Sequence, residues 1–155
     1  LFDPQAKEAA QFGDAVHAVF EQIEWYTDEA EELLDGDAEA VAMVRTCLEE
    51  SEIQEHFTAD PEAVVWRERR FGVVLDGEFC SGVFDRVVLW PDRAEIVDFK
   101  TDMVRDAVDV EAAVARHQSQ LDWYRRVLAL MTGLPFEHIT CRLLFARLPR
   151  LVTVP

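Results

Sequence analysis

The chain has 155 residues and half of them are apolar, so it can bury a core and is too hydrophobic for a disordered tail. It contains no apolar run near the roughly 20 residues that cross a bilayer and shows no signal-peptide pattern, so we expect a single cytoplasmic domain over residues 1–155 without a membrane partner. The net charge of −16 disfavours a free-standing DNA binder, because such proteins normally present a basic surface.

Charge is distributed unevenly along the chain. Residues 1–62 carry 18 acidic and 2 basic side chains, whereas residues 63–155 carry 13 of each. We therefore expect an acidic helical front, residues 1–62, followed by a neutral and arginine-rich αβ core, residues 63–155. Acidic runs of this kind are typical of solvated helix faces, and a docking surface for a partner is the alternative.

The three cysteines, Cys47, Cys80 and Cys141, are scattered and form no CxxC pair. This spacing indicates neither a zinc site nor an iron–sulfur cluster. We expect them to be small buried side chains in a reducing compartment.

The front of the chain predicts three helices. Apolar residues recur at helical spacing over residues 6–26, and a short acidic helix is expected over 28–36, closed by Gly36. Asp37 is a candidate N-cap for a third helix that runs to about residue 57. Asp60 and Pro61 then end the helical pattern.

The pattern changes to strands at residue 64. Strands are expected over 64–75, 78–90 and 94–100, joined by turns at Asp76-Gly77 and Pro91-Asp92. A long helix follows over 108–131, ended by Gly133, and then strands over 138–147 and 150–154. The order predicts a mixed α/β fold with a central sheet of four to five strands, begun by an antiparallel meander and flanked by helices.

The two hairpins set a register that gathers acidic residues. A two-residue turn at Asp76-Gly77 places Glu68 opposite Asp85, and a turn at Pro91-Asp92 places Asp85 opposite Asp98. Directly opposed side chains lie roughly 4.5–5.5 Å apart at Cβ. Lys100 is two residues beyond Asp98 and so projects from the same face.

Three acids in one row repel one another unless a cation lies between them. Mg²⁺ takes oxygen ligands and is usually held by one or two carboxylates with water and phosphate, so the row is typical of a divalent-metal site. The alternative is that these are solvated acids paired with Arg67, Arg69 or Arg86, and a β-bulge would shift the register.

Five segments carry further signals, in this order: a G-x-x-x-H spacing from Gly13 to His17, "VVWRERRF" around Glu68, "GVFDRVV" around Asp85, "IVDFKTD" around Asp98 and Lys100, and "QLDWY" from Gln120 to Tyr124. Together they resemble the motifs of the PD-(D/E)xK nuclease superfamily, and within it the RecB-like nuclease domains of RecB/AddA-type helicase–nuclease subunits. The resemblance runs through most of the chain and implies a restriction-endonuclease-like core. Asp-x-Lys alone is a weak motif, but five segments in order are specific.

The resemblance also implies roles for these residues. It makes His17, Asp85, Asp98 and the Phe99 carbonyl the ligands of Mg²⁺, or of Mn²⁺ in its place. It makes Lys100 the group that orients or activates the attacking water and stabilises developing charge. It makes Glu68 a support for the metal cluster or for a second metal. Gln120 and Tyr124 would contact the substrate backbone or brace the site. The four cysteines of the iron–sulfur members are absent.

Several of these residues have a structural alternative. A lone histidine on the apolar side of a helix, such as His17, is usually part of the core, and Tyr124 is an equally good core residue. The remaining histidines, His56, His117 and His138, show no pattern and are expected to be structural.

The function implied by the resemblance is metal-dependent hydrolysis of DNA phosphodiesters by an exonuclease-type module of double-strand-break repair and recombination. The chain would be a segment of a longer helicase–nuclease polypeptide, with single-stranded DNA delivered by a helicase domain and a partner subunit nearby. The main alternative is a non-cutting scaffold that docks a partner through the acidic front. A stand-alone restriction or repair nuclease is disfavoured, because the sequence shows no separate DNA-reading segment.

Overall fold

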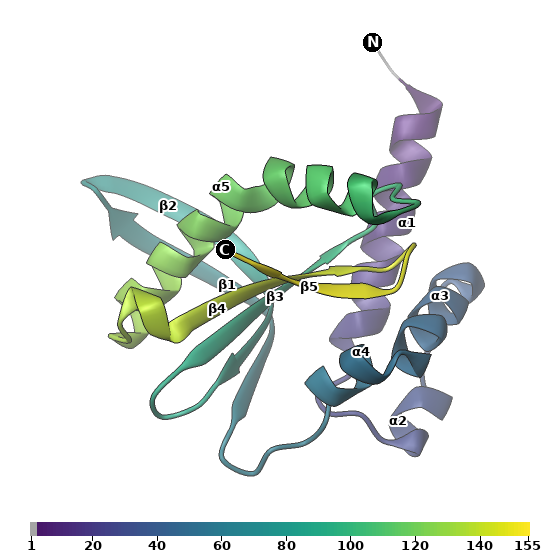
Figure 1. The fold of residues 1–155 in the computed structure, drawn as a ribbon, viewed down its shortest axis with the longest axis horizontal. Coiled ribbons are helices and arrows are strands. Elements are labelled where there is room, and N and C mark those ends of the chain that lie inside the picture. Colours follow the sequence, from purple (N-terminus) through teal and green to yellow (C-terminus); the bar gives the residue numbers. More distant parts are fainter. Residues whose placement is uncertain (1–2) are drawn as a thin grey trace.

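A computed structural model of the chain describes residues 3–155, in which helices cover a five-stranded sheet on both faces (Figure 1). The strands are β1 (Val64–Leu75), β2 (Glu78–Leu89), β3 (Ala94–Lys100), β4 (Ile139–Phe145) and β5 (Arg150–Val154), in that spatial order. The first three form an antiparallel meander, β4 lies parallel to β3, and β5 is antiparallel to β4. The predicted mixed α/β fold is confirmed.

The long helix α5 (Ala107–Thr132) makes the crossover that the parallel pair β3 and β4 requires. Its N-cap is Asp106, whose side chain accepts from the Asp109 N–H, and it ends at Gly133 with a φ of 76°. A short 3₁₀ turn, η1 (Phe136–His138), then leads into β4.

The other helices belong to the acidic front and are α1 (Pro4–Glu21), α2 (Asp28–Glu32), α3 (Ala38–Glu49) and α4 (Ser51–His56). Side-chain caps begin the first three, and the predicted cap at Asp37 is confirmed, since its Oδ1 accepts from the Ala40 N–H at 2.9 Å.

The expected third helix is divided in two. Glu50 is extended, with φ −74° and ψ 123°, and separates α3 from α4. Leu48 and Ile53 are both fully buried, yet they are five residues apart and would face about 140° apart on one continuous helix. The break lets both enter the core, and the Gln54 side chain donates to the freed Leu48 carbonyl at 3.1 Å.

The first helix also ends earlier than expected, at Glu21 rather than residue 26. The carbonyls of Ile23 and Glu24 accept hydrogen bonds from the Arg86 guanidinium at 2.8 and 2.7 Å. The last carbonyls of a helix have no partner within the helix. Here the Arg86 side chain of β2 donates to the carbonyls that follow α1 instead.

Two apolar clusters lie on opposite faces of the sheet. Residues of α1, α3 and α4 pack against Val97 and Phe99 of β3, whereas residues of α5 pack against Ala94 and Ile96 of the same strand. This alternation is what a strand buried on both faces requires. No helix within residues 3–155 is long and apolar enough to cross a membrane.

Two of the three cysteines match the expectation of burial. Cys47 and Cys141 are fully buried, on opposite faces of the sheet. Cys80 is only half-buried, because it lies on the β1–β2 hairpin where that hairpin extends beyond the rest of the sheet (Figure 1).

The β1–β2 hairpin has the predicted register but changes face in the middle. Asp76 and Gly77 both have positive φ, 52° and 80°, as the two-residue turn requires. Trp66 and Phe71, five residues apart, nevertheless both pack on the α5 side, as do Phe84 and Val87 of the partner strand. In a regular strand, residues an odd number apart face opposite sides, so both strands switch face together.

The switch is located at Glu68 and Asp85. Arg67 pairs with Arg86 and Arg69 with Phe84, so no residue is inserted in either strand, but Glu68 has a φ of 48° and the ladder skips it. A non-glycine residue in this left-handed region costs about 1–3 kcal/mol, and such residues concentrate at functional sites.

Candidate active site

Asp85 and Asp98 meet where strands β2 and β3 separate. The last backbone pair between these strands is Arg86 with Val97, so the predicted pair of Asp85 with Asp98 falls just beyond the ladder. Asp85 Oδ2 instead accepts the Phe99 N–H at 2.9 Å. The side chain of Asp85 therefore bridges the opening between the strands, and each acid alters the pKa of the other.

Asp98 is a buried carboxyl, with 5% of its surface exposed. Burial, followed by the charge of Asp85, raises the pKa of Asp98 to about 7. Lys100 Nζ lies 2.7 Å from Asp98 Oδ2 and partly offsets this rise. Burial therefore disfavours the ionised form of Asp98 even though Lys100 lies beside it.

His17 approaches Asp85 from α1. Its Nδ1 lies 2.7 Å from the Gly13 carbonyl and its Nε2 lies 3.1 Å from Asp85 Oδ2. Burial lowers the pKa of His17, but the hydrogen bond and charge of Asp85 outweigh it and the pKa rises to about 9. Both ring nitrogens face acceptors, so the imidazolium is the form that donates at both positions.

Gly13 explains why α1 can lie so close to the strand end. A Cβ at this position would be 3.1 Å from Thr101 Oγ1, tighter than ordinary contacts. A glycine inside a helix costs about 1 kcal/mol relative to alanine, so it signals a close approach. The G-x-x-x-H spacing therefore supplies both the contact of the helix and the carbonyl that orients His17.

Glu68 lies at the rim of the site. It lines a hollow of about 320 Å³ together with Asp14, His17, Ala18 and Glu21. Burial and the charge of Asp85 raise the pKa of Glu68. The structure thus brings Glu68 to the same site as His17 and Asp85, though through the switch in β1 rather than through a regular ladder.

Gln120 and Tyr124 on α5 form a polar chain that begins at Lys100. Lys100 Nζ donates to Gln120 Oε1 at 3.2 Å, and Gln120 Nε2 donates to the Tyr124 hydroxyl at 3.4 Å. Burial and the charges of Asp98 and Asp85 raise the pKa of Tyr124 to about 12. The Tyr124 ring packs on Phe84, in the aromatic part of the core. This geometry suits bracing of Lys100, and substrate contact remains a prediction for the exposed Gln120.

The donor set suits a divalent cation by its chemistry, because it offers two adjacent carboxylates and an imidazole. Within the described residues, however, no three His, Cys, Asp or Glu side chains stand together as a group that could hold a metal ion. Lys100 lies against Asp98 and His17 against Asp85, so protein cations face the oxygens that a metal would use. The assignment of His17, Asp85, Asp98 and the Phe99 carbonyl as metal ligands stays a prediction.

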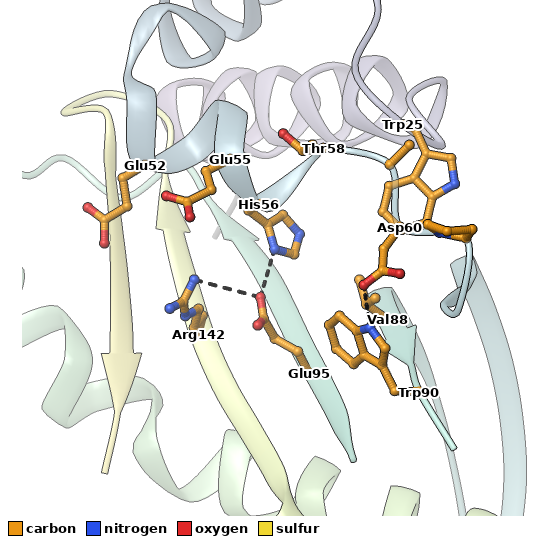
Figure 2. Close-up of a pocket in the computed structure, with 12 residues that line it drawn as sticks. Trp25, Glu52, Glu55, His56, Thr58, Asp60, Val88, Trp90, Glu95 and Arg142 are labelled. Atoms are coloured by element: carbon orange, nitrogen blue, oxygen red, sulfur yellow. Dashed lines mark hydrogen bonds and ion pairs between the residues drawn. The ribbon is translucent and has the colours of Figure 1, made fainter. Parts of the chain in front are cut away.

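A second polar cluster lies on the face of the sheet that α1 and α4 cover, and it was not anticipated from the sequence. Arg86 is 1% exposed, and its Nε donates to His56 Nε2 at 3.0 Å. His56 Nδ1 lies 2.7 Å from Glu95, which also faces Arg142 at 3.8 Å. Figure 2 shows Glu95 between His56 and Arg142. Only the apolar neighbours of Arg86 in "GVFDRVV" hinted that this arginine is buried.

A hollow of about 480 Å³ adjoins this second cluster, lined by residues that include Trp25, Asp60 and Trp90 (Figure 2). The indole N–H of Trp90 donates to Asp60 at 2.8 Å. In this hollow Glu95 pairs with His56 and Arg142, and Asp60 pairs with Trp90, whereas Glu52 and Glu55 are exposed to solvent.

The amino-acid sequence of this chain is similar to sequences of known proteins. A family model described as the PD-(D/E)XK nuclease superfamily matches residues 2–152. A protein of Limosilactobacillus fermentum (strain NBRC 3956 / LMG 18251), named as a subunit of an ATP-dependent helicase/nuclease, is 34% identical over an alignment of 114 residues, and the match covers 63% of this chain. The chain spans 8% of the length of that relative.

Proposed function

This chain belongs to the PD-(D/E)XK nuclease superfamily, and on that basis we propose that it hydrolyses DNA phosphodiesters with the help of a divalent metal. The observation that carries the proposal is the meeting of Asp85, Asp98, Lys100 and His17 at the opening between β2 and β3. The two carboxylates lie side by side and the charge of Asp85 disfavours ionisation of the buried Asp98, an arrangement that a bound cation would stabilise.

Asp85 and Asp98 would hold Mg²⁺ or Mn²⁺, with His17 and the Phe99 carbonyl as further donors. A bound divalent ion would neutralise charge on the phosphate and lower the pKa of a water. His17 would have to lose its Nε2 proton before it could serve as a ligand, since only a neutral ring nitrogen has a free lone pair.

Lys100 would position the attacking water and stabilise the charge that develops on the phosphate. Its ammonium group is held by Asp98 on one side and by Gln120 on the other. This double contact supports a role as an oriented charge, because preorganised donors contribute most when they need no rearrangement. Glu68 would support the metal from the rim of the site.

The wider role proposed for the chain is that of a single nuclease domain within a longer helicase–nuclease polypeptide of the cytoplasm. The name of the relative and the small share of its length that the chain spans support this view. A helicase motor would deliver one DNA strand, and an exonuclease action in repair and recombination would follow. The acidic front, residues 1–62, would face a neighbouring domain or partner protein.

The direct test is cleavage of a labelled single-stranded oligonucleotide by the purified chain in Mg²⁺ or Mn²⁺. The wild type should shorten the strand, and chelation with EDTA should stop the reaction. The Lys100→Ala variant should cut at least about 100-fold more slowly, the effect typical of removing one oriented donor. Product lengths over time would separate exonuclease from endonuclease action.

The sequence offers one matched control, because Lys7 is its only other lysine. Lys7 is exposed on α1, and Lys7→Ala should cut like the wild type. Equal rates for Lys100→Ala and the wild type would remove Lys100 from the mechanism. A wild-type protein that cuts under none of these conditions would favour the non-cutting scaffold.

A further inference from the structure

A second hollow adjoins the candidate active site. It has a volume of about 330 Å³ and is lined by Glu21, Val65, Trp66, Arg67 and Arg69. Glu21 also lines the hollow that holds His17 and Glu68. The two hollows therefore share a wall, and a strand whose phosphate lies at the acid pair could extend from one into the other.

The two arginines of this hollow are anchored by groups that leave their charge uncompensated. Arg67 donates to the Glu21 carbonyl at 2.8 Å, and the Arg69 guanidinium lies 4.7 Å from the centre of the Trp66 ring. Within residues 3–155 neither arginine lies within ion-pair distance of a carboxylate, although the chain carries a net charge of −16. Most of their N–H donors therefore remain available to an anion.

Charge in the hollow favours an anionic ligand. Two arginines and one acidic residue, Glu21, line the hollow, so the formal charge of its lining is positive. Guanidinium groups bind phosphate through paired N–H donors, and both arginines are exposed on β1.

The left-handed conformation of Glu68 creates the pairing of Trp66 with Arg69. Residues three apart face opposite sides of a regular strand, so Arg69 could not lie over Trp66 without the switch at Glu68. One strained residue therefore places an acid at the rim of the active site and an arginine–indole pair in the next hollow. This coincidence explains why the strain, about 1–3 kcal/mol, would be retained.

We propose that the hollow of Trp66, Arg67 and Arg69 binds a nucleotide that flanks the scissile phosphate of single-stranded DNA. The arginines hold its phosphate, and the indole–guanidinium pair offers a plane on which an unpaired base stacks. The inference rests on the proposed function, since it takes the cleaved strand as the ligand. It adds a binding subsite whose residues take no part in the chemical step.

The experiment compares two substrates on the 155-residue chain in Mn²⁺. A single-stranded oligonucleotide has flanking nucleotides, whereas bis(p-nitrophenyl) phosphate is one phosphodiester without them. Arg69→Ala should raise KM for the oligonucleotide about tenfold with kcat unchanged, because base stacking contributes about 1–3 kcal/mol. Hydrolysis of the small phosphodiester should stay at the wild-type rate. Arg67→Ala should also lower the salt dependence of oligonucleotide binding by about one unit of slope.

Arg93 provides the matched control, since its guanidinium lies 4.3 Å from the Trp90 ring but is ion-paired with Asp92, away from this hollow. Arg93→Ala should leave KM for both substrates unchanged. An Arg69→Lys variant keeps the charge but loses the planar donor set, so it should recover only part of the affinity.

Three results would overturn the inference. Oligonucleotide KM could stay unchanged in both Arg67→Ala and Arg69→Ala, or the variants could lose activity equally on both substrates, which would mean that they disturb the acid pair instead. A wild type that hydrolyses neither substrate would sink the proposed function and this subsite with it. Circular dichroism of each variant would show whether an equal loss comes from unfolding, which also removes support for the subsite.

Discussion

Two histidine–carboxylate pairs join helices α1 and α4 to the sheet, and they differ in charge. His17 faces Asp85 at 3.1 Å, and His56 faces Glu95 at 2.7 Å. The pKa of His17 is raised to about 9, whereas the pKa of His56 is lowered. Similar contacts therefore produce a charged ring at one site and a neutral ring at the other.

The surroundings of each ring account for the difference. Burial lowers the pKa of both histidines, but His17 faces two carboxylates, those of Asp85 and Asp98. For His56 the raising effect of Glu95 is opposed by the charges of Arg86 and Arg142. The hydrogen bonds agree, because His56 can donate from Nδ1 to Glu95 and accept at Nε2 from Arg86, as only a neutral ring does.

This contrast distinguishes the candidate active site around Asp85 from the structural cluster around Arg86. Asp85 and Arg86 are neighbours in the sequence, but Asp85 belongs to the cluster with His17 and Arg86 to the cluster with His56. Around Arg86 the charges and hydrogen bonds are nearly complete, so the cluster joins α4 and the segment after α1 to the sheet. Around Asp85 an acid is left with its pKa raised, and that imbalance is what a cation or phosphate-binding reaction would use.

The largest expected effect on stability concerns the polar cluster around Arg86. Arg86→Met would remove a buried guanidinium and leave the Ile23 and Glu24 carbonyls and His56 Nε2 without their donor. We expect the free energy of unfolding to fall by about 3–5 kcal/mol, the usual cost of breaking a buried charged network. Urea denaturation measures it directly.

Arg126 is a suitable control for that substitution, because it is exposed and pairs with the exposed Asp76. Arg126→Met should change the unfolding free energy by less than about 0.5 kcal/mol. A loss below about 1 kcal/mol for Arg86→Met would show that solvent satisfies these carbonyls and that the cluster is not structural.

The next largest effect is a change in the free energy of unfolding that differs in sign between neutral variants of Asp98 and Glu95. Asp98→Asn should raise the free energy of unfolding at pH 8 by about 2 kcal/mol, because it removes a buried charge that its surroundings disfavour. Glu95→Gln should lower it by about 1–2 kcal/mol, because the pKa of Glu95 is lowered by its cationic partners. Destabilisation by both substitutions would contradict the imbalance assigned to the acid pair.

The pH dependence of stability should separate these acids as well. Folded Asp98 keeps its proton up to about pH 7, whereas the unfolded chain releases it near its ordinary value of 3.8, so this group makes stability fall as pH rises from 4 to 7. Glu95 acts in the opposite way, since its contribution is present above 4.5 and is lost as pH falls below that value. Urea denaturation of the Asp98→Asn variant across pH 4–8 should show the first trend flattened.

The smallest effect concerns the two histidines. The contribution of His17 is complete below pH 6.5 and is lost as pH rises through about 9, which should cost about 1 kcal/mol after allowance for its 32% exposed side chain. NMR titration of the ring protons should show His17 titrating near 9 and His56 below 6.5. Overlapping titrations would mean that the two pairs have the same charge state.

A His17→Gln variant should flatten the decline of stability between pH 6.5 and 9. His138→Gln alters an exposed histidine outside both clusters and should leave that decline in place. If both variants behave alike, the decline arises elsewhere in the chain.

The order of elements, the meander and the hairpin register could all be predicted from the amino-acid sequence. Those features depend on local chemistry, such as the positive φ that Asp76 and Gly77 accept, so turn residues and alternating patterns were sufficient. The hairpin register likewise placed Asp85 beside Asp98, and the motifs identified the superfamily.

The charge states and the breaks in regular structure, in contrast, depend on how the chain folds. The division of the third helix, the switch at Glu68 and the burial of Arg86 each involve groups distant in sequence. A pKa is set by burial and by charges that the fold brings near, so no motif could distinguish the charged His17 from the neutral His56.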